Sequence, residues 1–118
     1  MSYPDPSYFG EAGEASVTVR RADSPPDLDY GGGNTVDYLA TGASTDGSFG
    51  LYRWNFSSGG PGPHFHRTIS ESFFILSGTV EIHDGTGWSE TGSGDFAHVP
   101  PGASTGSATT PASPPRCC

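Results

Sequence analysis

Two histidines and one glutamate near the middle of the chain have the types and spacing of metal ligands. His64 and His66 are two residues apart, so both imidazoles project to the same face if the segment is extended. Glu71 follows beyond a short polar loop that can bring its carboxylate back beside the two rings. Two neutral imidazoles and a carboxylate suit a divalent transition metal and leave positions open for water or substrate. The alternative is a polar patch of histidines on an edge strand, with Glu71 as a solvated loop acid.

The surrounding residues resemble the first motif of the cupin superfamily, G-x5-H-x-H-x3,4-E-x6-G. His64, His66, Glu71 and Gly78 fall at the spacings of this motif, whereas Ser58 stands where the motif has its leading glycine. The resemblance implies a jelly-roll β-barrel with a metal held by the two histidines and the glutamate. This donor set accepts most first-row divalent ions, so Fe, Mn, Ni, Co, Cu and Zn are all candidates.

A second cupin motif, G-x5-P-x-G-x2-H-x3-N, is matched only in its first half. Gly94, Pro100 and Gly102 fall at its spacings, but Thr105 stands in the place of its histidine and Thr109 in the place of its asparagine. In the family the missing histidine is the fourth metal ligand. The resemblance therefore implies a site of three ligands with reduced metal affinity.

Two other histidines are alternative fourth ligands. His98 lies on an expected strand just before a Pro-Pro-Gly turn, and His83 ends another expected strand. Either could reach the metal only if the strand register turns its side chain inward. The competing interpretation is that both are histidines on an outer strand face.

The composition after the second motif suggests why the match breaks. Every residue from 103 to 115 is Ala, Ser, Thr, Gly or Pro, so we expect no strand with a packed apolar face there. Read in another frame with GC-rich codons, STGSATTPASPP becomes HGFRNDSGEPAP, which restores the histidine and the asparagine at the motif spacing. We hypothesise a single-nucleotide frameshift near Ala103.

The chain as a whole predicts short strands joined by tight turns. It contains 18 Gly and 11 Pro, and no segment has helical periodicity. Alternation begins at Ser16, and Tyr52, Trp54 and Phe56 share one strand face that we expect in the core. The dipeptide DG after His83 predicts a hairpin. Strand candidates are residues 16–19, 35–40, 48–56, 72–76, 79–83, 88–90 and 95–99. The expected fold is an all-β, cupin-type jelly-roll β-barrel that is incomplete at its C-terminus.

Three segments are expected within the 118 residues. Residues 1–15 read as a flexible N-terminal arm, residues 16–102 as the cupin β-barrel domain, and residues 103–118 as a low-complexity, disordered tail. Cys117 and Cys118 are adjacent, so they lack the spacing of a zinc pair and are expected to have no structural role.

The charge balance excludes some partners. Thirteen acids against five arginines and no lysine give a net charge of −8, so no basic surface is available for nucleic acid or an anionic membrane. The first residues lack the basic and apolar regions of a signal peptide, which predicts a cytoplasmic protein.

Three functions remain compatible with these residues. The first is a metal-dependent enzyme acting on a small organic molecule, and the family resemblance implies dioxygenase or isomerase chemistry. The second is a non-catalytic module that binds a metal or a small molecule, and the third is an inactive truncated product. A homodimer is implied by the resemblance alone.

Overall fold

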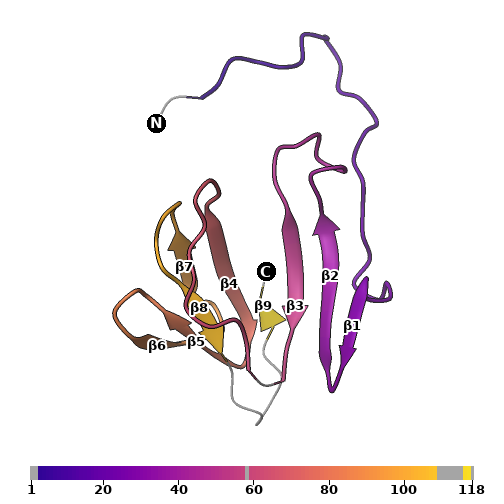
Figure 1. Ribbon diagram of the computed structural model, residues 1–118. Coiled ribbons are helices and arrows are strands. Elements are labelled where there is room, and N and C mark those ends of the chain that lie inside the picture. Colours follow the sequence, from indigo (N-terminus) through magenta and orange to yellow (C-terminus); the bar gives the residue numbers. More distant parts are fainter. Residues whose placement is uncertain (1–2, 58, 109–115, 118) are drawn as a thin grey trace.

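The computed structural model describes residues 3–57, 59–108 and 116–117, which form antiparallel strands and no helix. A six-stranded sheet has the order β1-β2-β3-β9-β4-β7, and a three-stranded sheet has the order β6-β5-β8 (Figure 1). The strands are β1 (Leu28–Gly31), β2 (Asn34–Ala40), β3 (Leu51–Asn55), β4 (Glu71–Ser77), β5 (Thr79–His83), β6 (Trp88–Gly92), β7 (Phe96–Val99), β8 (Gly106–Ala108) and β9 (Arg116–Cys117). The two sheets do not join edge to edge in the described chain, so the predicted all-β, incomplete jelly roll is confirmed. No described helix is long and apolar enough to span a membrane.

The hydrophobic core forms where the period-two alternation of the strands turns apolar side chains inward. In β4, Phe73 and Ile75 are buried while their neighbours Phe74 and Leu76 are exposed. The remaining buried apolar residues are Phe56, Val80, Ile82 and Val99, with Trp54, Ala97 and Ala103 packed against them. The predicted aromatic core face of β3 is confirmed for Trp54 and Phe56, whereas Tyr52 is 47% exposed.

The hairpin between β5 and β6 forms at the predicted DG dipeptide. The carboxylate of Asp84 accepts hydrogen bonds from the backbone N–H of Thr86, the Thr86 hydroxyl and the backbone N–H of Gly87. These bonds favour the ionised carboxylate and lower the pKa of Asp84 to about 2. The turn is therefore held by a charged acceptor over the whole neutral pH range.

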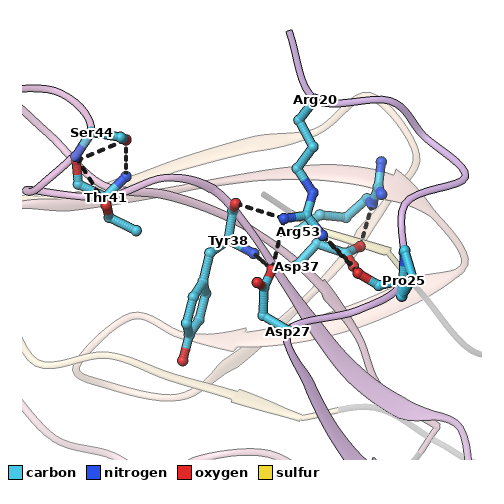
Figure 2. Close-up of polar contacts among 8 residues, drawn as sticks. All are labelled: Arg20, Pro25, Asp27, Asp37, Tyr38, Thr41, Ser44 and Arg53. Atoms are coloured by element: carbon cyan, nitrogen blue, oxygen red, sulfur yellow. Dashed lines mark hydrogen bonds and ion pairs between the residues drawn. The ribbon is translucent and has the colours of Figure 1, made fainter. Parts of the chain in front are cut away.

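An ion-pair cluster joins the segment before β1 to the outer face of β2 and β3 (Figure 2). Asp37 is 4% exposed, and its carboxylate lies 2.8 Å from Nε of Arg53 and 3.6 Å from a terminal guanidinium nitrogen of Arg20. Arg20 also lies 2.8 Å from the carboxylate of Asp27 and donates to the carbonyl of Tyr38. Two cations thus compensate one buried anion, and Arg20 is fixed in place.

The alternating segment at residues 16–19 forms no strand. Val17 and Val19 are 87% and 67% exposed, and the segment pairs with no strand in the described chain. A strand needs a hydrogen-bonding neighbour as well as a suitable sequence, so the pattern by itself is insufficient here.

Residues 103–108 differ from the tail that was expected to begin at residue 103. Thr105 pairs with His64 in an antiparallel bridge, and β8 pairs with β5. Thr105 is 1% exposed. Backbone pairing needs no apolar side chain, which is why the composition alone was misleading for this segment.

A glycine is required at position 60, where the loop that precedes His64 passes close to the backbone of β8. A Cβ atom on Gly60, at φ 145°, would lie 2.1 Å from the carbonyl oxygen of Ser107. Residues 109–115 and Cys118 of the expected tail lie outside the described residues. The backbone of Cys117 belongs to β9, between Trp54 and Ile75, so Cys117 does take part in the sheet.

We predict that Asp37→Asn lowers the free energy of unfolding by about 2 kcal/mol, because Arg20 and Arg53 would keep their charges without a buried anion. Urea denaturation measures this change. The control is Asp46→Asn, at an exposed position with φ 55°, a conformation that asparagine tolerates. Equal losses in the two variants would contradict a specific role for Asp37.

We predict that Thr105→Val raises the free energy of unfolding by about 1 kcal/mol. The Oγ1 atom of Thr105 is buried and has no hydrogen-bond partner among the described residues, so removing it ends a desolvation cost. Thr35→Val is the matched control, because the Thr35 hydroxyl accepts a hydrogen bond from Asn55 and its loss should lower stability. Thermal unfolding of both variants would show opposite shifts, and a loss in both would refute the prediction.

Candidate metal centre

The two histidines of the first motif lie on a segment that is held to the second motif by backbone hydrogen bonds. The N–H and C=O of His64 both bond to Thr105 at 2.7 Å, and the carbonyl of His66 accepts from the N–H of Gly102 at 2.7 Å. The imidazole rings lie 5.1 Å apart between centroids, edge to face. The segment is thus extended, and the two rings are neighbours.

Glu71 is brought back to the histidines by the loop of residues 67–70. It is the first residue of β4 and pairs with Val99 of β7. Its Oε2 atom lies 3.2 Å from Nε2 of His66, and the side chains of both residues are about one-third exposed, 31% and 36%. His66 thus lies next to both the His64 ring and the Glu71 carboxylate, and we call these three residues the ligand cluster.

The hydrogen bond of His64 determines which of its nitrogens is available. Nδ1 of His64 lies 2.7 Å from the carbonyl oxygen of Gly62. A carbonyl can only accept, so Nδ1 carries the proton, and in the neutral ring Nε2 has the free lone pair. A backbone carbonyl in this role is the usual support for a metal-binding histidine.

The cluster is not arranged around a single point. Among the described residues, no group of three or more His, Cys, Asp or Glu side chains is placed to hold a metal ion. Glu71 instead contacts His66 directly, and both side chains are partly exposed. The donor types themselves, two imidazoles and a carboxylate, suit a divalent transition metal.

Thr105 occupies the position beside His64 where the second motif has its histidine. Directly opposed residues of an antiparallel pair project to the same face, so the Thr105 side chain and the His64 imidazole are neighbours by position. A threonine hydroxyl is a weaker ligand than an imidazole for most first-row divalent ions. Thr105 also lines a pocket of about 160 Å³ whose apolar wall includes Ile82, Ala97, Val99 and Ala103.

The two alternative histidines have other partners. His98 is exposed on β7, and its Nδ1 lies 3.0 Å from the hydroxyl of Ser72, which is on the opposite face of β4 from Glu71. His83 accepts a hydrogen bond from the N–H of Gly85 and stacks edge to face on Trp88. Both histidines also line the pocket of about 160 Å³ beside Thr105. Among the described residues, neither is placed to hold a metal ion together with His64, His66 and Glu71.

A second pocket was not predicted from the sequence. It has a volume of about 260 Å³ and is lined by Tyr30, Asn34, Trp54, Phe56 and Gly60. The aromatic pattern of β3 pointed to Trp54 and Phe56, but Tyr30 and Asn34 come from the β1–β2 hairpin, whose position depends on tertiary structure. Phe73 and Ile75, on the inward face of β4, line neither pocket and are buried in the core.

No family model matches the sequence, and no curated protein matches it. Solved structures do match. A predicted oxalate decarboxylase from Thermotoga maritima is 19% identical, with a TM-score of 0.70 over 86% of this chain and 94% of that one. The polyketide cyclase RemF from Streptomyces resistomycificus is 22% identical, with a TM-score of 0.65 over 86% of this chain and 75% of that one.

An RmlC-like cupin from Shewanella frigidimarina is 21% identical, with a TM-score of 0.56 over 75% of each chain. At these identities the similarity establishes the fold. The agreement with the motif around His64 and Glu71 is independent of it, because the motif was read from residue spacing alone. The described chain has the cupin fold.

Proposed function

We propose that this chain is a metal-binding cupin protein in which His64, His66 and Glu71 hold a divalent transition metal. The observation that carries the proposal is the hydrogen bond from Nδ1 of His64 to Gly62, which leaves Nε2 with a free lone pair on a ring that neighbours the ring of His66. His66 in turn contacts Glu71. The candidate ions are Fe, Mn, Ni, Co, Cu and Zn, since the donor types do not select among them.

When bound, such an ion would supply a Lewis acid at the surface end of β4. His64 and His66 would orient it through neutral imidazoles, and Glu71 would balance one of its charges. The apolar side chains of Val99 and Ala103 would limit the access of water from the pocket side. Thr105 lines the same pocket from the side of the second motif.

The reaction that we propose is dioxygenase or isomerase chemistry on a small organic molecule. The pocket beside Thr105 has a volume of about 160 Å³, similar to cavities of about 150 Å³ that accept benzene. The structural neighbours include a predicted oxalate decarboxylase and a polyketide cyclase, which supports substrates that carry a carboxylate or a carbonyl group.

A non-catalytic binding module is the second candidate, and the residue at position 105 favours it. With Thr105 in place of a fourth ligand, only three protein ligands are offered, and the described residues do not arrange them to hold an ion. Weak and reversible metal binding suits sensing or storage as well as catalysis. Oxygen consumption with small phenols and keto acids separates the two candidates once metal content is known.

We predict that the purified chain, dialysed to equilibrium against each candidate ion in turn, retains about one metal per chain above the buffer level and that His64→Ala abolishes this retention. Elemental analysis by mass spectrometry measures it. His98→Ala is the matched control, because His98 is bonded to Ser72 on the outer face and should not affect metal content. Unchanged retention in His64→Ala, with unchanged circular dichroism, would rule out the assignment of His64.

We predict that Thr105→His raises metal affinity at least tenfold, about 1.4 kcal/mol. The pairing with His64 places the new imidazole on the same face, and the adjacent pocket of about 160 Å³ provides room for it. Competition with a chromophoric chelator measures the affinity. Thr105→Leu, which fills similar space without a donor atom, is the control. An equal affinity in Thr105→His and the parent chain would place position 105 outside the metal site.

A further inference from the structure

The pocket of about 160 Å³ is formed by residues of both sheets. Ile82 belongs to β5 of the three-stranded sheet, whereas Ala97 and Val99 belong to β7 of the six-stranded sheet. The wall also includes Ala103 and Thr105, which lie on the segment that leads from β7 to β8. Each of these five residues is in the part of the chain that the structure describes.

Two residues of the wall are direct cross-strand neighbours of the proposed metal ligands. Val99 is paired with Glu71, and Thr105 is paired with His64. Directly opposed residues of an antiparallel pair project to the same face, so each of these wall side chains lies next to a ligand side chain. A molecule bound at the ligand cluster can therefore place a further group in the pocket.

The inward side chains of the wall are apolar and belong to the hydrophobic core. Ile82 and Val99 are buried, and Ala97 and Ala103 pack against the same core cluster. Two of these four residues are alanines, whose side chains extend only one methyl group from the backbone. A larger residue at either position would project into the space that the pocket now occupies.

The two histidines at the border of the pocket have their rings engaged elsewhere. His98 is next to Val99 on β7, so strand alternation turns its ring to the opposite face, where Nδ1 lies 3.0 Å from the hydroxyl of Ser72. The ring of His83 stacks edge to face on Trp88. The part of a ligand that enters the pocket therefore meets mainly apolar side chains.

Asp84 is the charged residue of the pocket border. The hydrogen bonds of the β5–β6 turn lower the pKa of its carboxyl group to about 2, so it is ionised at neutral pH. A second anionic group on a ligand would meet this carboxylate, on a chain whose net charge is already −8. The pocket therefore favours a group without negative charge.

The volume limits the size of that group. Cavities of about 150 Å³ in protein cores hold benzene, so a pocket of about 160 Å³ accepts one six-membered ring or a branched alkyl group of about six carbons. A second fused ring would exceed it.

We propose that the pocket receives the uncharged hydrocarbon group of a monocarboxylic acid, a single ring or branched alkyl group of about six carbons, and that Ala97 and Ala103 determine this size. The carboxylate of the ligand would face the ligand cluster, so its placement rests on the proposed metal-binding function. The hydrocarbon site itself needs no metal, because core side chains form its wall.

Benzene and naphthalene test the hydrocarbon site in the metal-free full chain. Carbon–proton NMR spectra are expected to show saturable shifts of the Ile82 and Val99 methyl groups with benzene, while the exposed methyl groups of Val17 stay unchanged. Naphthalene is expected to bind at least about tenfold more weakly, because its second ring does not fit. Absence of the benzene shifts in the folded chain, or equal affinity for the two hydrocarbons, would overturn the proposal.

Substitutions in the wall test which residues set the size. Ala97→Leu is expected to weaken benzene binding at least about tenfold, and Ala22→Leu, at an exposed position, is the matched control. Ile82→Ala enlarges the pocket and is expected to remove the preference for benzene over naphthalene. This second variant decides the matter if circular dichroism shows that Ala97→Leu does not fold. An unchanged preference in folded Ile82→Ala would contradict the assignment of the site.

Benzoate and terephthalate test the class of ligand. Calorimetry is expected to show that zinc raises the affinity for benzoate at least about tenfold, and that terephthalate, with a second carboxylate at the far end of its ring, binds at least about tenfold more weakly than benzoate. Benzene binding without any zinc retention would refute the metal-binding function and leave the hydrocarbon site standing. Zinc retention without a gain in benzoate affinity, or equal affinity for the two acids, would refute the assignment of a monocarboxylic acid.

Discussion

The backbone pairing of His64 with Thr105 connects the two segments on which the candidate site depends. Two hydrogen bonds of 2.7 Å fix the histidine segment against residues 102–105, and the chain then continues directly into β8 on the edge of β5. Burial of Thr105 follows from this pairing, as does the position of the His64 ring. Without it, the residues that carry the first motif would belong to an exposed loop, and the smaller sheet would lose one of its three strands.

Much of the fold could be predicted because side-chain periodicity is a local property. Strand ranges 72–76 and 79–83 were expected where β4 and β5 form, and a DG dipeptide located the β5–β6 hairpin. β8 escaped prediction because a strand of Gly, Ser and Ala is specified by its backbone partners. The segment at residues 16–19 shows the reverse case, in which strand-forming residues have no partner edge in the described chain.

The sequence predicts which residues belong to the candidate site, but not how their side chains are arranged. The motif spacing indicates that His64, His66 and Glu71 lie near one another, because this proximity requires only an extended segment and a short loop. The hydrogen-bond partners of the imidazole nitrogens depend on tertiary contacts that the spacing does not encode. Nδ1 of His64 contacts the Gly62 carbonyl, and Nε2 of His66 contacts the Glu71 carboxylate. Outward-facing His98 likewise follows from the register of β7 against β4, which the sequence pattern left open.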